Sequence, residues 1–123
     1  MSKHRVPRTG RPMLTFFGDL IAKRECRSAA EQGRCEYHVR LFRTEAPGYV
    51  LAVHYRSDGE SHYWAAHTPN RLEVADLFER YASETQPQGA ALDAFQDAMQ
   101  DIMLQAPELD ELVKWSSIVA AGQ

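Results

Sequence analysis

The stretch Glu36–Arg56, EYHVRLFRTEAPGYVLAVHYR, decides the fold of this chain. Its two ends, Glu36–Arg43 and Tyr49–Arg56, are rich in the β-branched and aromatic residues that favour strands. Between them lies the segment Thr44–Gly48, whose Pro-Gly pair is typical of a turn. The stretch therefore predicts an antiparallel β-hairpin.

A five-residue loop also predicts the register of this hairpin. It pairs Leu41 with Leu51, Val39 with Val53 and Tyr37 with Tyr55, which gathers the apolar side chains on one face. We call the opposite side the open face. From these two strands it should carry His38, Arg40, Phe42, Val50, Ala52, His54 and Arg56.

Two further strands extend the hairpin into a four-stranded antiparallel meander. The first is Met13–Lys23, MLTFFGDLIAK, in which Gly18 indicates a bulge. The last is Ser61–His67, reached through the turn Ser57–Glu60, and it should add Tyr63 and His67 to the open face. The polar segment Arg24–Gly33 is expected to be a loop.

The second half of the chain changes to a helical period. Helices are predicted over 69–82, with Asn70 and Glu73 as a capping box, and over 90–105 and 108–120. The predicted class is α+β, with a sheet over 13–67, one helix over 69–82 and a helical part over 90–121. With 123 residues, residues 13–123 are expected to form a single domain.

The charge is unevenly distributed along the chain. Residues 1–43 carry ten Lys and Arg against four Asp and Glu, a net +6, whereas residues 44–123 carry four against thirteen, a net −9. Residues 1–12, MSKHRVPRTGRP, hold no acid and are predicted to be a flexible basic arm. Such asymmetry favours contact with a polyanion, and attraction between the two halves is the alternative.

The composition also bears on localisation and cofactors. No apolar run is long enough to span a bilayer and the N-terminus has no apolar signal region, so a cytoplasmic protein without a membrane partner is expected. Cys26 and Cys35 are then expected to be free thiols. A zinc site recruiting His38 would lack a fourth ligand and the tight cysteine spacing, so no metal or other cofactor is predicted.

These features predict a non-enzymatic binding module, because no catalytic motif is present and His62 and His67 fall on opposite faces. The preferred partner is nucleic acid, with a single strand as one option. Cations of the arm would contact its phosphates, and the open face would stack on its bases. The expected binding residues are Lys3, Arg5, Arg8, Arg11, His38, Arg40, Phe42, His54, Arg56 and Tyr63.

Three alternatives remain at this stage. The patch formed by Phe42, Val50 and Ala52 could be a homodimer or other protein contact, or the open face could simply be solvated. The acidic helices could instead bind a basic partner, as a small inhibitor or assembly factor would, through a stripe of Asp93, Asp97 and Asp101. The element order over residues 13–82 resembles that of whirly-type single-strand-binding proteins, a likeness of element order without a shared residue motif.

Overall fold

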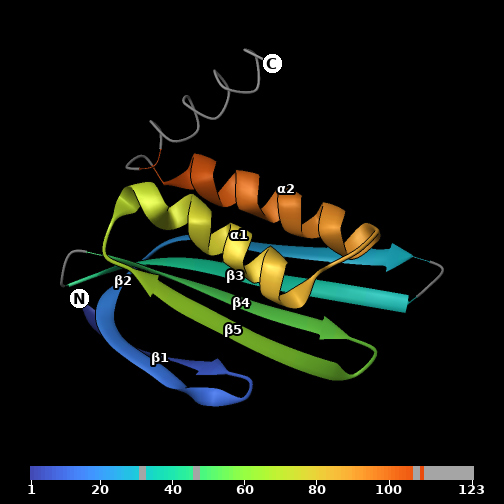
Figure 1. Ribbon diagram of the computed structural model, residues 1–123, viewed down its shortest axis with the longest axis horizontal. Coiled ribbons are helices and arrows are strands. Elements are labelled where there is room, and N and C mark those ends of the chain that lie inside the picture. Colours follow the sequence, from blue (N-terminus) through green and yellow to red (C-terminus); the bar gives the residue numbers. More distant parts are fainter. Residues whose placement is uncertain (31–32, 46–47, 107–108, 110–123) are drawn as a thin grey trace, which may run out of the picture.

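A computed structural model describes residues 1–30, 33–45, 48–106 and Leu109 (Figure 1). One antiparallel sheet has its strands in chain order and precedes two helices, which confirms the α+β class but with five strands in place of four. The third helix predicted over 108–120 lies outside the described residues except for Leu109. The elements are β1 (Ser2–Arg8), β2 (Arg11–Ala30), β3 (Gly33–Thr44), β4 (Tyr49–Ser57), β5 (Glu60–Thr68), the 3-10 turn η1 (Arg71–Glu73), α1 (Val74–Thr85) and α2 (Ala90–Gln105).

The central hairpin has the predicted register. Leu41 pairs with Leu51, Val39 with Val53 and Tyr37 with Tyr55. At the next turn, between β4 and β5, Asp58 and Gly59 both have positive φ, as a tight two-residue hairpin turn requires.

Both helices pack against the same face of the sheet, as Figure 1 shows. Their buried residues (Val74, Leu77, Phe78 and Tyr81 of α1; Phe95, Ala98, Ile102 and Met103 of α2) follow the predicted helical period. Trp64 of β5 completes this core: its ring lies 5.5 Å from that of Tyr81, and its Nε1 donates to Glu84 at 2.6 Å. Among the described residues, no helix is long and apolar enough to cross a membrane.

The start of the first helix departs from the predicted capping box. The Asn70 side chain accepts from the backbone of Leu72 at 2.9 Å, but the Glu73 carboxylate accepts from the Thr68 hydroxyl at 2.8 Å. Leu72 lies in the 3-10 turn and is exposed, so the apolar stripe of this helix begins only at Val74.

The predicted flexible arm is wrong, because Ser2–Arg8 is strand β1. It pairs with the first half of β2 from Ser2–Gly18 to Arg8–Arg11, and Pro7 occupies the position where the register shifts. Proline is tolerated there because β1 is an edge strand with a bulge. The turn after β1 also bonds to β5: the Thr9 backbone donates to the Tyr63 carbonyl and the Tyr63 backbone to the Thr9 hydroxyl, both at 2.8 Å.

Strand β2 is much longer than predicted, and the expected loop Arg24–Gly33 belongs largely to it. Its second half pairs with β3 as far as Ala30–Gly33, so cross-strand hydrogen bonds stabilise a segment that is polar in sequence. The register shifts at Ile21, close to Gly18, where a bulge was expected. At Gly18 a Cβ atom would collide with the carbonyl oxygen of Arg43, so only glycine fits this approach of β2 to β3.

Strand β1 and the first half of β2 give the sheet a second core on its open face. The β1–β2 hairpin curls beneath the sheet, on the side away from the helices (Figure 1). It places Val6, Leu14 and Phe16 against Phe42 and its neighbours, and Phe42 is only 1% exposed. The prediction of Phe42 as an exposed ring is therefore wrong. The other buried members of this cluster are Val50, Ala52 and Ala65.

We expect Phe42→Ala to lower the free energy of unfolding by about 3–5 kcal/mol, because it removes a buried ring that contacts both Phe16 and His4. Phe17→Ala is the matched control, since Phe17 is 50% exposed on the same hairpin and should change stability by no more than about 0.5 kcal/mol. Urea denaturation of the two variants measures both values. Equal losses would mean that the hairpin does not cover Phe42.

Candidate nucleic-acid interface on the open sheet face

The β1–β2 hairpin covers only part of the open face, and the remainder is a half-exposed row of side chains. The pairing of β2, β3, β4 and β5 aligns Glu25, His38, His54 and Tyr63 across the sheet. We call these four residues the ring row. They line a shallow hollow of about 280 Å³ together with Lys23, Arg24, Val39 and Arg40.

The three rings of the row stack on one another. The rings of His54 and Tyr63 are 4.2 Å apart and nearly parallel, at 6°, and those of His38 and His54 are 5.6 Å apart at 27°. Both faces of the His54 ring are therefore occupied by its neighbours. A ligand in the hollow would meet the polar edge of that imidazole and not its face.

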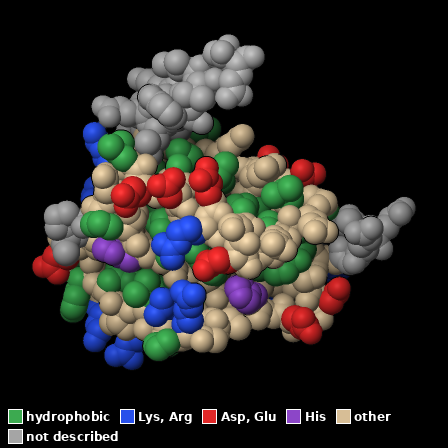
Figure 2. Space-filling view, in the orientation of Figure 1, with side chains coloured by type: hydrophobic (Ala, Val, Ile, Leu, Met, Phe, Trp, Pro, Cys, Tyr) green, Lys and Arg blue, Asp and Glu red, His purple; other side chains and the backbone are tan. Residues whose placement is uncertain are grey.

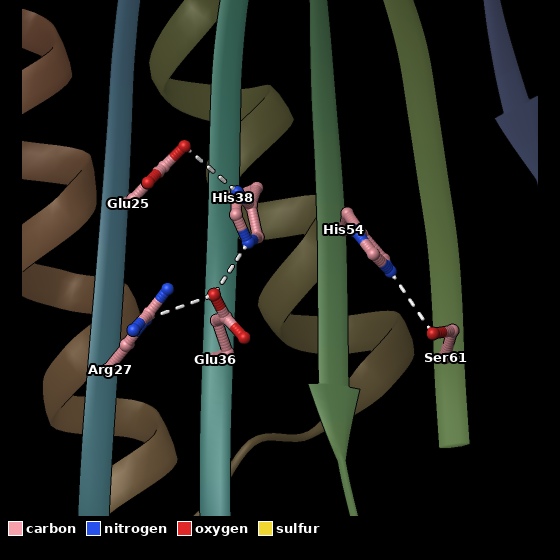
Figure 3. Close-up of polar contacts among 6 residues, drawn as sticks. All are labelled: Glu25, Arg27, Glu36, His38, His54 and Ser61. Atoms are coloured by element: carbon pink, nitrogen blue, oxygen red, sulfur yellow. Dashed lines mark hydrogen bonds and ion pairs between the residues drawn. The ribbon is translucent and has the colours of Figure 1, made fainter. Parts of the chain in front are cut away.

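His38 lies between two carboxylates (Figure 3). Its Nδ1 is 3.3 Å from an oxygen of Glu25 and its Nε2 is 3.0 Å from an oxygen of Glu36. Both ring nitrogens of His38 therefore face carboxylate oxygens. Glu36 also accepts from Arg27 at 3.1 Å, and the hydrogen bond from His38, followed by the charge of Arg27, lowers the pKa of Glu36.

His54 has a different environment from His38. Its Nε2 is 3.2 Å from the Ser61 hydroxyl, also drawn in Figure 3. Partial burial lowers the pKa of His54, and the positive charges of His38 and Arg56 lower it further. The two imidazoles of the row therefore have different partners, two carboxylates for His38 and a hydroxyl for His54.

Cations surround the ring row on the same face. Five Lys and Arg side chains share this face with two carboxylates, Glu25 and Glu36. The face therefore carries three excess positive charges when both histidines are counted as neutral. Within the described part of the chain, Arg40 and Arg56 form no ion pair with a carboxylate, and the Arg40 guanidinium lies 5.3 Å from the Phe42 ring centre. The five are Lys23, Arg27, Arg34, Arg40 and Arg56, placed there by strand alternation.

The structure brings together only some of the predicted binding residues. His38, Arg40, His54, Arg56 and Tyr63 share the uncovered part of the open face. Phe42 lies on the same face but is buried.

The four cations of the expected arm do not join them. Lys3 and Arg5 alternate with the inward-facing His4 and Val6, so they point away from the open face. Arg8 donates to the Pro12 carbonyl at 2.7 Å, and Arg11 lies 3.8 Å from Glu84 of α1.

Sequence reasoning missed the contribution of β2. Glu25 and Arg27 belong to a segment interpreted as a loop, and Lys23 ends the predicted strand before it. The three residues nevertheless recur with the period of two that places side chains on one strand face. That alternation was the signal that could have found them.

The two cysteines are free and half-buried on the helix-facing side of the sheet. Cys26 pairs with Tyr37, whereas His38 points to the open face. The cysteines and His38 therefore do not form one donor set, and the described residues contain no group of three metal-ligating side chains.

Comparison with protein-family models, with curated proteins and with solved structures found no match. The fold and the site alone define the class: an α+β protein in which a curled five-stranded sheet is covered by helices on one face and carries a basic, histidine-containing surface on part of the other.

The low pKa of His54 can be tested by NMR titration of the imidazole signals. We expect His54 to titrate below its ordinary value of 6.5, and His38→Gln to move that pKa upward because it removes a neighbouring positive charge. Since the folded protein then binds fewer protons at His54 than the unfolded chain, stability should fall as the pH decreases through the range just below 6.5. A His54 pKa at or above 6.5 would contradict this electrostatic account.

Proposed function

We propose that this chain is a nucleic-acid-binding module that holds a single strand along the uncovered part of the open face. The observation that supports this proposal is the ring row flanked by Lys23, Arg40 and Arg56 on one surface of the sheet. Cations that track a backbone beside aromatic side chains are the usual components of single-strand-binding surfaces.

The geometry changes the expected mode of contact with the bases. Because Phe42 is buried and His54 is stacked on both sides, most of the recognition falls to hydrogen bonds from ring edges and to phosphate contacts. Tyr63 is at the end of the row, so one face of its ring is not covered by the row. Single strands suit such a surface, since their unpaired bases expose hydrogen-bonding edges.

The distribution of charge favours the same surface. Figure 2 shows acidic side chains gathered over the helical layer, with Lys and Arg toward the side of the β1–β2 hairpin. A polyanion would be repelled by the helical layer, which leaves the opposite side of the sheet for it.

A protein-interaction module is the second candidate, and the exposed Asp93 and Asp97 of α2 favour it. The third residue of the predicted acidic stripe, Asp101, is already engaged by Arg24 at 3.7 Å and by Gln105 at 2.9 Å. The apolar patch considered for a homodimer is covered by the chain's own Val6, Leu14 and Phe16.

A pair of double variants tests the proposed surface. In salt titrations with a single-stranded oligonucleotide, Arg40→Ala with Arg56→Ala should weaken binding and reduce the slope of log K against log salt by about 0.7 for each lost phosphate contact. Lys3→Ala with Arg5→Ala removes the same charge from the outward side of β1 and should leave the slope nearly unchanged.

Equal effects of the two double variants would show attraction to net charge alone and would overturn the assigned surface. If the wild-type chain binds neither single nor double strands at low salt, the nucleic-acid proposal fails and the protein-interaction module replaces it.

A further inference from the structure

A second hollow lies on the other side of the sheet. Its lining includes residues of the connection between α1 and α2, whose path Figure 1 shows. Its volume is about 470 Å³, within the range of small-ligand sites. Tyrosines from three elements line it, namely Tyr37 of β3, Tyr55 of β4 and Tyr81 of α1. The remaining lining residues are His62, Glu84, Thr85, Gln86, Pro87, Gln88 and Ala91.

The three tyrosine rings of the hollow lie close to one another. The rings of Tyr37 and Tyr55 are 4.8 Å apart at 43°, and those of Tyr37 and Tyr81 are 6.3 Å apart and nearly perpendicular. Tyr37 and Tyr81 are each only 1% exposed, and burial raises the pKa of both phenols, so they stay neutral. Tyr55 is half-buried and is thus the ring most accessible to a ligand.

The charge of this hollow is opposite to that of the open face. Glu84 is the carboxylate among its described lining residues, none of which is Lys or Arg. The Trp64 indole fixes the Glu84 side chain by donating to Oε2 at 2.6 Å. Arg11 lies 3.8 Å from Oε1 but lines a neighbouring hollow and not this one.

The α1–α2 connection forms part of the lining of the hollow. Gln86 ends α1 in the left-handed conformation, with φ of 49°, and its amide donates to the Ala82 carbonyl at 2.8 Å. Gly89 precedes α2 with φ of 58°. These two turns shape the segment Gln86–Gln88 that contributes to the lining.

We infer that this hollow is a binding site for a small planar organic cation, such as an amidine or an aromatic amine. Tyrosine rings attract cations through their negative faces, and a carboxylate adds a charged hydrogen-bond acceptor. An anion would instead meet the carboxylate of Glu84, whose cationic partner Arg11 lines the neighbouring hollow and not this one. The site is separate from the proposed nucleic-acid surface, so either assignment can fail without the other.

Three probes of one shape and different charge test the assignment on the whole chain. Benzamidine is the cation, benzamide the neutral analogue and benzoate the anion, each titrated by NMR with calorimetry. We expect saturable binding of benzamidine with shifts at Tyr55, Tyr81 and Ala91, at least about tenfold weaker binding of benzamide, and none of benzoate.

Matched variants separate the site from general charge effects. Glu84→Gln keeps a carbonyl that can accept from Trp64, so the fold should persist while benzamidine affinity falls by about tenfold or more. Glu79→Gln removes an exposed acid of the same helix and should leave affinity unchanged. Tyr55→Phe should retain binding and Tyr55→Ala should weaken it.

Several results would overturn the inference. They are the absence of saturable benzamidine binding, equal affinity for the three probes, shifts confined to residues outside the hollow, or equal affinity of the Glu84→Gln variant and the wild type. Thermal unfolding of each variant shows whether it is folded. If Glu84→Gln is misfolded, the affinities of Tyr55→Phe and Tyr55→Ala for benzamidine decide whether the hollow is the binding site.

Discussion

The path of β2 is the constraint on which the rest of the structure depends. One strand of 20 residues pairs with β1 along its first half and with β3 along most of its length. The register shift at Ile21 and the close approach at Gly18 separate these halves, so the first half can curl beneath the sheet. Without that bend, Phe42 and Val50 would be exposed to water.

The bend gives a small chain two cores on one sheet. The larger core lies between the sheet and the helices, and the smaller one lies beneath the β1–β2 hairpin. The contacts between Thr9 and Tyr63 hold the end of that hairpin against β5. Both faces of the central strands are therefore partly buried, and within the described part of the chain the region of the ring row remains open on the second face.

This partial cover separates two regions of opposite electrostatic character. On the open face, Lys and Arg side chains outnumber the two carboxylates, Glu25 and Glu36, and Glu36 is paired with Arg27. At the α1–α2 connection, Glu84 stands among tyrosines with no lysine or arginine in the lining. A polyanion and a small cation are accordingly the ligands that we assign to the two surfaces.

The sequence by itself determined the central hairpin, its register, the two described helices and the α+β class, because period-two and period-3.6 patterns depend only on neighbouring residues. It also placed His38, Arg40, His54, Arg56 and Tyr63 on one face. Only the tertiary structure decided that residues 2–8 form a strand, that Phe42 is buried and that Lys23, Glu25 and Arg27 join the site. The physical reason is that β1 and the second half of β2 have little apolar periodicity of their own. Distant partner strands therefore provide their hydrogen bonds and burial.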